Sequence, residues 1–223
     1  MKRTADILLT LLLAALAPAL LTGCDEGDND TPADQLLEQI VTFTGNEGPN
    51  AGFEYQAIDD SPLIRLTVMG NLNEEEVNPG TRLLMRYRLP AGTQPDAGGE
   101  VSLTGLQRIL TDTVTTVSEQ PVQEPLYLLT IQRSGEYLNV QSQMASTSHR
   151  SLEVTATPLP GSDGLTDLYI SPRYGENGAD AYLTTTWASL WIGPVWRDNA
   201  SSGVRVHIAN SNNIYRTEFI FKK

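Results

Sequence analysis

The sequence has one cysteine and two histidines in 223 residues, and these shortages exclude several kinds of site. A single cysteine cannot form an intramolecular disulfide. His149 and His207 with one thiol are too few ligands for a typical zinc site, which takes three or four His, Cys or carboxylate groups. Phosphate-binding glycine loops and a G-x-S-x-G elbow are also missing. We therefore expect no metal and no cofactor.

No apolar run is long enough to span a bilayer. The longest, Ile7 to Leu21, covers 15 residues and follows the basic residues Lys2 and Arg3. A membrane helix needs about 20 apolar residues, and Pro18 disfavours a continuous helix here. This pattern predicts a signal peptide over residues 1–23 that is removed from the mature protein.

The lone cysteine follows this segment directly. Leu21-Thr22-Gly23-Cys24 resembles a bacterial lipobox, in which the thiol takes a diacylglycerol and a small residue precedes it. A buried core cysteine is the alternative, but the flanking chain has no core pattern. We therefore predict lipid attachment at Cys24, with acyl chains such as palmitate holding the protein on a membrane.

Residues 24–37 are rich in acid and predict a solvated tether. The acidic run Asp25 to Asp30 resembles the surface-export signal of Bacteroidetes-type lipoproteins. It implies an outer-membrane lipoprotein of a Gram-negative bacterium, exposed on the cell surface. Without such a signal the protein would face the periplasm.

Charge argues against nucleic acid as a partner. The whole chain carries a formal charge of −12, and residues 38–118 contain eleven acidic and five basic side chains. An acidic surface repels phosphates, so no nucleic-acid binding is expected.

The periodicity predicts short strands, and the fold class is all-β. In Arg82–Leu89 the residues Leu83, Met85, Tyr87 and Leu89 alternate with a mostly cationic face. Further strands are expected near residues 39–44, 53–58, 63–69, 101–110, 152–157, 168–172, 182–192, 204–209 and 215–221. Thr31-Pro32 favours at most a short N-terminal helix or turn, running through Leu36, Leu37 and Ile40.

A hairpin is predicted in residues 126–141. With Ser134-Gly135 as a two-residue turn, Arg133 faces Glu136, Ile131 faces Leu138 and Leu129 faces Val140. Two apolar pairs and one pair of opposite charge then share a face, as cross-strand pairing favours.

The proline-containing segment 119–125 predicts a linker between two domains. Strand number and spacing predict a small barrel over residues 38–118. An antiparallel β-sandwich is predicted over residues 126–223.

Several segments resemble the NigD-like lipoproteins. They are "NPGTRLLMRYRL" (78–89), "LTGLQRILTDTV" (103–114), "GEYLNVQSQ" (135–143), "SHRSLEV" (148–154) and "YRTEFIF" (215–221). The resemblance implies that residues 38–118 form a barrel of the oligonucleotide-binding (OB) type, an OB-like domain, and that a C-terminal β-sandwich domain follows. It also implies that the protein is a lipoprotein. It implies no catalytic residues, and its only functional hint is an association with a bacteriocin locus.

Candidate catalytic groups are sparse. Ser148 and His149 are adjacent, so on a strand they point to opposite faces. His207 alternates with Arg205, which favours a solvent-facing position. Asp59-Asp60 and Glu74-Glu75-Glu76 lie in expected loops, where acidic runs are usually solvated.

All three tryptophans lie in one segment, "TTWASLWIGPVW". Trp187 and Trp191 are four residues apart, so on a strand they share a face, and Trp196 follows. Exposed, Trp187, Trp191 and Trp196 would form a stacking platform for sugar rings, near Tyr182. Buried, they would be sandwich core, which the large apolar area of tryptophan favours. Asn210, Asn212 and Asn213 either bind sugar hydroxyls or form a turn.

These observations favour a non-enzymatic, lipid-anchored envelope protein that binds a protein or glycan partner. One alternative is a carboxylate-driven glycan hydrolase, which needs two carboxyl groups about 5–10 Å apart across a cleft. Another is an accessory or immunity protein of a bacteriocin locus, which only the family resemblance implies.

Overall fold

The computed structural model of the protein describes residues 35–73, 75–147, 149–175, 182–212 and 216–223. All of these residues belong to one compact unit. Almost all regular structure in them is strand, which confirms the all-β prediction. Within these ranges the one helix is α2 (Gly193–Trp196). No helix in the described part of the chain is long and apolar enough to cross a membrane.

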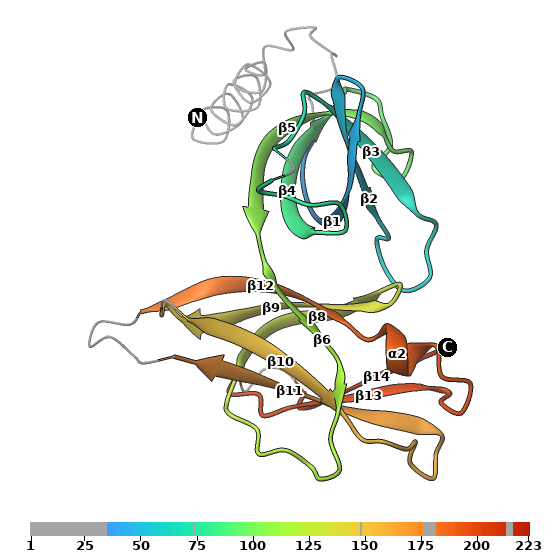
Figure 1. Cartoon of the computed structure of the whole chain (residues 1–223), viewed down its shortest axis with the longest axis vertical. Coiled ribbons are helices and arrows are strands. Elements are labelled where there is room, and N and C mark those ends of the chain that lie inside the picture. Colours follow the sequence, from blue (N-terminus) through green and yellow to red (C-terminus); the bar gives the residue numbers. More distant parts are fainter. Residues whose placement is uncertain (1–34, 74, 148, 176–181, 213–215) are drawn as a thin grey trace, which may run out of the picture. The chain divides into compact units, whose positions relative to one another are not determined.

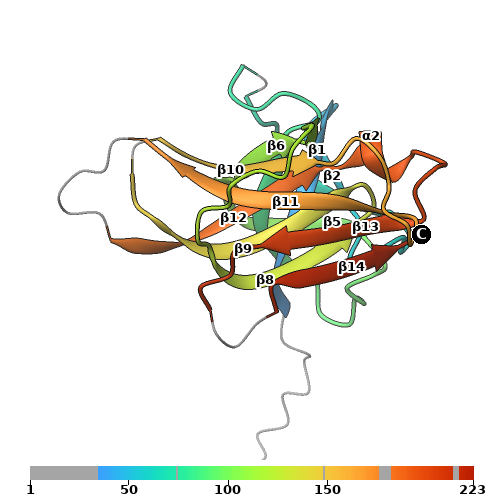
Figure 2. The same ribbon diagram turned by 90° about the horizontal axis from the view of Figure 1, so that it is seen from below.

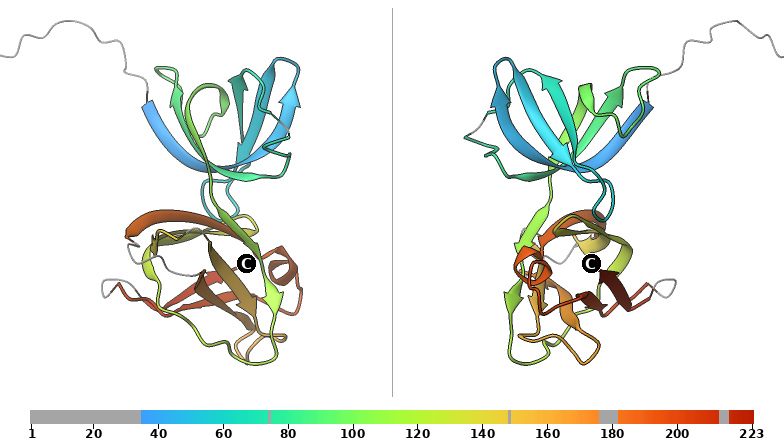
Figure 3. Two further views of the ribbon diagram at one scale, coloured as in Figure 1. Left: turned by 60° about the vertical axis from the view of Figure 1, so that its left-hand side comes forward. Right: turned by 90° about the vertical axis from the view of Figure 1, so that its right-hand side faces the viewer.

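Five strands close into a barrel in the order β1-β2-β3-β5-β4 (Figure 1). They are β1 (Gln35–Glu47), β2 (Asn50–Tyr55), β3 (Ile64–Met69), β4 (Arg82–Leu89) and β5 (Gly99–Arg108). Neighbouring strands are antiparallel except β3 and β5, whose parallel pairing closes the barrel. The pairing register shifts between Phe43 and Gly45, in the strongly curved strand β1 (Figure 3). Such bulges let a strand bend around a small barrel.

The alternation in β4 fills the barrel core as the sequence predicts. Leu83, Met85, Tyr87 and Leu89 are buried among side chains of the other strands, including Phe43. Arg86 and Arg88 of the opposite face are exposed. At the start of that face, however, Arg82 and Leu84 are buried.

The short helix expected through Leu36, Leu37 and Ile40 is wrong, because these residues lie in β1. β1 pairs with β4 in continuous register from Gln35↔Leu89 to Thr42↔Arg82. Leu37 packs against the barrel core, and Leu36 is 64% exposed on the other face. Pairing with a buried strand outweighs the weak stability of a short helix. Thr31 and Pro32, the expected helix start, lie outside the described residues.

The other nine strands form two sheets stacked as a sandwich (Figure 2). One sheet has the order β14-β13-β11-β10-β7 and the other β6-β12-β9-β8. The strands are β6 (Leu110–Thr113), β7 (Thr115–Thr116), β8 (Tyr127–Ser134), β9 (Tyr137–Ala145), β10 (Arg150–Ala156), β11 (Leu165–Tyr174), β12 (Leu183–Trp191), β13 (Gly203–Ile208) and β14 (Glu218–Lys222). Aliphatic side chains from both sheets form the core between them. Each strand expected from the sequence overlaps an observed one.

The sandwich is mixed rather than antiparallel throughout. Strand β6 pairs parallel with β12, β7 with β10, and β11 with β13. The parallel pairs arise where the chain changes sheet. Buried Val114 lies between β6 in one sheet and β7 in the other. Helix α2 lies between β12 in one sheet and β13 in the other.

Strand pairing places the change from barrel to sandwich strands between β5 and β6. It therefore comes earlier than the proline-containing segment 119–125, because β6 and β7 already pair with sandwich strands. That segment instead lies against the five-stranded sheet. Gln123 Nε2 donates to the carbonyl oxygens of Ile170 and His207 at 3.1 and 2.7 Å. The Glu124 amide donates to Ser171 Oγ at 2.9 Å.

The predicted hairpin is present as β8 and β9, but its predicted register is wrong. Arg133 pairs with Leu138 and Ile131 with Val140, a shift of two residues. Gly135 and Glu136 form the turn, and Gly135 has φ of 57°. A glycine at the first central position suits this two-residue turn. The shift leaves Arg133 and Glu136 free to bind other partners.

Candidate binding site

Arg82 at the start of β4 is 6% exposed and joins the barrel to the sandwich. Its Nε donates to Ser189 Oγ at 3.0 Å and its Nη2 to Asn139 Oδ1 at 3.2 Å, both on sandwich strands. Its Nη1 donates to Thr42 Oγ1 of β1 at 3.0 Å. The guanidinium carbon lies 4.4 Å from the centroid of the Tyr137 ring. The side chain is therefore held from several directions.

All three hydrogen-bond acceptors of Arg82 are neutral. Ser189 Oγ in turn donates to Asn139 Oδ1 at 2.9 Å. Within the described ranges no carboxylate forms an ion pair with Arg82, and Glu54 acts on it only through longer-range charge. Burial lowers the pKa of Arg82 to about 10, because removal from water disfavours the cation. The guanidinium is still protonated at neutral pH, so a net positive charge is buried here.

Arg82 forms part of the wall of a cavity of about 590 Å³. We call this cavity the Arg82 pocket; its wall includes Arg82, Arg108, Thr111, Tyr137, Ser189 and Trp191. These residues come from β4, β5, β6, β9 and β12. Two arginines, the acidic residue Asp112, two aromatic residues and several hydroxyl-bearing residues thus line one space. Ligand sites commonly combine such rings with a few converging polar groups.

The three tryptophans do not form one platform. Trp187 and Trp191 are half-buried on β12, but Trp191 lines the Arg82 pocket and Trp187 a separate cavity of about 250 Å³. Trp196 is nearly buried on α2 and packs with the sandwich core. Tyr182 is exposed immediately before β12. Only Trp191 of these four residues lies in the pocket wall.

Trp191 is fixed by a neighbouring ion pair. Its Nε1 donates to Glu136 Oε2 at 3.3 Å, and Arg197 binds both oxygens of Glu136 at 2.5 and 2.6 Å. The hydrogen bond from Arg197 holds the pKa of Glu136 below its usual value. The carboxylate is therefore ionised and orients the indole at the edge of the pocket.

A second buried arginine, Arg133 on β8, contrasts with Arg82. It is 2% exposed, and its Nη1 and Nη2 donate to the two oxygens of Asp60 at 2.8 and 2.7 Å. Asp59 lies 3.5 Å away, and the guanidinium carbon is 4.2 Å from the centroid of the Trp196 ring. Arg133 therefore has its countercharge within the protein.

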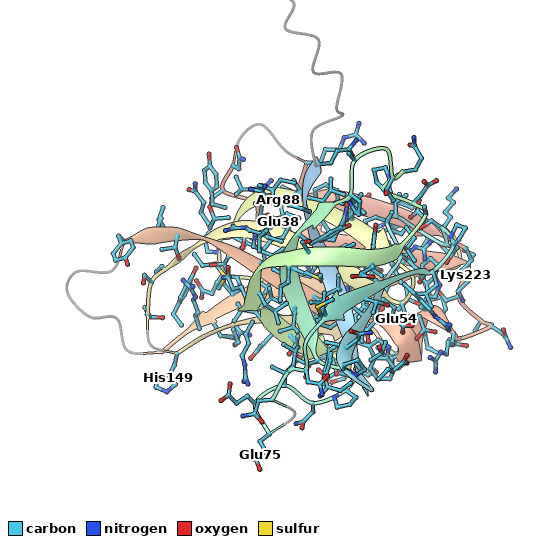
Figure 4. The ribbon with its side chains drawn as sticks, turned by 90° about the horizontal axis from the view of Figure 1, so that it is seen from above. Glu38, Glu54, Glu75, Arg88, His149 and Lys223 are labelled. Carbon is cyan, nitrogen blue, oxygen red and sulfur yellow. The ribbon has the colours of Figure 1, made fainter. Side chains whose placement is uncertain are left out.

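The candidate catalytic carboxylates lie on separate loops. Asp59 and Asp60 follow β2 and bind Arg133, whereas Glu75 and Glu76 follow β3. There the Glu76 carboxylate accepts from Asn73 Nδ2, and the Glu75 backbone amide donates to Asn73 Oδ1. Glu74 lies outside the described residues. Glu75 and His149 point outward at the periphery (Figure 4). Ser148 also lies outside the described residues, so the Ser148–His149 pair is not seen together.

His207 is half-buried rather than simply facing water. Its Nε2 lies 2.7 Å from Asp167 Oδ1, and its ring stacks on Tyr169 with centroids 4.9 Å apart. Arg205 binds Asp163 and Asp167 on the same face of the sheet. Within the described part of the chain, no group of three His, Cys, Asp or Glu residues is placed to hold a metal ion.

The asparagines form a turn rather than an open site. Asn210 Oδ1 accepts from the amides of Leu128 and Asn212, and Asn212 Nδ2 donates to the Leu128 carbonyl at 2.9 Å. Asn213 lies outside the described residues. Both side chains thus hydrogen-bond to strand β8, and Asn210 Nδ2 also donates to the carbonyl oxygen of Arg216.

Arg82 and Tyr137 were not predicted as site residues from the sequence. A signal for Arg82 was present, because Leu84 lies on the same strand face. An aliphatic residue on an otherwise cationic face indicates that this part of the face is covered. Tyr137 follows the hairpin turn and gives no comparable signal.

The proposed lipid attachment residue, Cys24, lies outside the described residues. No family model matches the sequence, and no curated protein matches it. Its fold does occur in solved structures. A protein of unknown function from Bacteroides vulgatus matches with a TM-score of 0.61 and 14% identity, over 85% of this chain and 91% of that one.

Two further structures carry names that bear on function. A NigD-like immunity protein from Bacteroides caccae matches with a TM-score of 0.56 and 11% identity, over 86% of this chain and 98% of that one. A protein named as a candidate lipoprotein from Bacteroides fragilis matches with a TM-score of 0.53 and 9% identity, over 84% of this chain and 97% of that one. The chain therefore has the fold of a NigD-like protein, which confirms at the level of the fold the resemblance seen in its strand motifs.

Proposed function

We propose that the protein is a non-enzymatic, lipid-anchored envelope protein that binds a ligand in the Arg82 pocket. The observation that carries this proposal is the buried cation Arg82, held by neutral groups in the wall of a cavity of about 590 Å³. Burying an unpaired charge costs free energy. The hydrogen bonds of Arg82 supply no countercharge, so a bound anion would offset this cost, and Arg82 therefore favours ligand binding.

The carboxylates and histidine considered for catalysis support binding over hydrolysis. Asp60 is held by Arg133, and His207 is close to Asp167 and stacked on Tyr169. Asp59-Asp60 and Glu75-Glu76 come from different loops with different partners. A glycan hydrolase would need two free carboxyl groups on one cleft.

A photo-crosslinking residue at the pocket tests the binding role in intact cells. Thr111 is exposed and lines the pocket, whereas Leu159 is exposed in the β10–β11 loop outside it. We expect a specific glycan or protein adduct from position 111 and none from position 159. Equal or absent crosslinking at both positions would count against the pocket as the binding site.

The membrane anchor is supported by the lipobox at Leu21–Cys24 and by the candidate lipoprotein among the fold neighbours. Metabolic labelling with a palmitate analogue, followed by fractionation, tests it. Cys24→Ala should lose the label and leave the membrane fraction. A folded Cys24→Ala protein that stays with the outer membrane would refute the anchor.

Surface exposure is a separate part of the proposal, because it depends on the acidic run. Protease added to intact cells should cleave the wild-type protein on the surface. A variant with Asn or Gln at Asp25, Glu26, Asp28 and Asp30 should become protected until the cells are lysed. Protection of the wild-type protein would indicate the periplasmic side.

A second candidate function is immunity or an accessory role at a bacteriocin locus. One fold neighbour is named as a NigD-like immunity protein and another as a toxin-related protein. A deletion strain should then become more sensitive to the bacteriocin produced from the same locus. Unchanged sensitivity would remove this candidate.

A further inference from the structure

The two buried arginines make similar contacts but differ in countercharge. Each guanidinium lies over an aromatic ring and hydrogen-bonds to groups on other strands. Arg133 binds both oxygens of Asp60, while Arg82 binds only Ser189, Thr42 and Asn139. Both arginines make three hydrogen bonds, and those of Arg133 go to Asp60 and to the Gly135 carbonyl oxygen, so they differ in charge and not in the number of bonds. Arg82 is thus the buried cation for which an external anion would supply the missing countercharge.

The rest of the Arg82 pocket favours an anion attached to a polar ring. Arg108 is exposed in the same wall, and its Nη2 donates to the carbonyl oxygen of Glu76. Asp112 also lines the pocket, but its Oδ2 accepts the Val154 amide at 2.9 Å. Trp191 supplies an aromatic surface, and the hydroxyl of Thr111 supplies a hydrogen-bonding group.

We propose that the Arg82 pocket binds the carboxylate of an acidic sugar. The carboxylate would lie against Arg82 and Arg108, the sugar ring would pack on Trp191, and the threonine hydroxyls would bind ring hydroxyls. Arginine suits this role, because its planar donors match a carboxylate. This inference rests on the proposed function, because it assigns a ligand to the same pocket. It does not depend on the lipid anchor.

Titration calorimetry on the purified full-length protein tests the inference, with D-glucuronate as the probe and D-glucose as its neutral counterpart. We expect glucuronate to bind at least about tenfold more tightly than glucose, because charge-assisted hydrogen bonds are the stronger kind. Raising the salt from about 0.05 to about 0.5 M should weaken glucuronate binding through screening.

Variants at three arginines test whether the positive charge of the pocket, and not the stability of the fold, determines glucuronate binding. Arg108→Gln changes an exposed side chain of the pocket and should weaken glucuronate binding several-fold without unfolding the protein. Arg82→Gln should weaken it about tenfold or more, with Arg82→Lys intermediate because it keeps the charge but loses the planar fork. Arg86→Gln is the matched control, since Arg86 is exposed on the same strand and binds Glu38 outside the pocket.

Each outcome bears on the inference. No binding of glucuronate at about 10 mM, equal binding of glucose, or unchanged affinity in Arg108→Gln and folded Arg82→Gln would overturn it. An acetylated tetrapeptide with a free C-terminal carboxylate is the competing probe. Tighter binding of that peptide would overturn the sugar assignment in favour of a protein terminus. A pocket-specific crosslink at position 111 without glucuronate binding would leave the proposed function intact and reject only this ligand.

Discussion

Arg133 and Asp60 lie 73 residues apart in the sequence, but two hydrogen bonds of 2.8 and 2.7 Å join them. Asp60 belongs to a loop between barrel strands, and Arg133 to a strand of the sandwich. The arginine is buried and the carboxylate is largely exposed. The exposed carboxylate of Asp60 therefore neutralises the charge of the buried Arg133. The ion pair also connects the β2–β3 loop to the end of β8.

Asp60→Asn should destabilise the protein, because the buried guanidinium loses its main countercharge. We expect a loss of about 1–3 kcal/mol in the free energy of unfolding, the cost of leaving a buried donor without its acceptor. Urea denaturation measures it. Asp59→Asn is the control, since Asp59 lies farther from Arg133, at 3.5 Å, and should cost less. Equal losses for the two variants would contradict the assigned role of Asp60.

The same pair predicts a dependence of stability on pH. The hydrogen bond from Arg133 lowers the pKa of Asp60 below its ordinary value of 3.8. A carboxyl group with a lowered folded-state pKa stabilises the protein above its unfolded-state pKa, near 4, and loses that contribution as the pH falls through the folded-state value. The stability difference between wild type and Asp60→Asn should thus be full at pH 7 and narrow below about pH 4. A difference that stays constant down to pH 2 would exclude this linkage.

The sequence predicts the fold well where one face of a strand is apolar. Leu83, Met85, Tyr87 and Leu89 alternate and fill the barrel core, so local pattern and tertiary burial agree. The pattern fails at Leu37 and Ile40, whose three-residue spacing fits one face of a helix but places them on opposite faces of the strand that forms. Pairing with β4 decides between the two, and no local signal contains that information.

The hairpin and the Arg82 pocket show a second reason why structure cannot be predicted from sequence patterns alone. The predicted pairing of Arg133 with Glu136 assumes that opposite charges in one hairpin bind each other. Arg133 instead binds Asp60, and Glu136 binds Arg197, so partners distant in the sequence set the register together with Gly135. The Arg82 pocket likewise combines residues from five strands. Spacing along the chain does not encode such a grouping.

Gly135→Ala should cost more stability than Gly48→Ala, although both glycines have similar positive φ, at 57° and 62°. An L-residue in this conformation costs about 1–2 kcal/mol at either site. A Cβ at Gly48 would meet nothing, whereas at Gly135 it would overlap Oε1 of Gln56. Gln56 would then lose its 2.8 Å hydrogen bond to the Ser61 carbonyl, at a further cost of about 1 kcal/mol. Thermal and urea unfolding of both variants measure the difference, and an equal loss would show that Gln56 moves freely.

Trp191 and Trp187 provide a matched pair for locating the ligand. Both are half-buried on β12, but only Trp191 lines the Arg82 pocket. If glucuronate packs on Trp191, its addition should change the tryptophan fluorescence of the wild-type protein and of Trp187→Phe. Trp191→Phe should lose most of that change and bind about tenfold more weakly, because stacking on a large ring is lost. Trp196 remains in both variants against Arg133, so it contributes the same background emission to each of them. A response that survives in Trp191→Phe and disappears in Trp187→Phe would move the ligand to the smaller cavity beside Trp187.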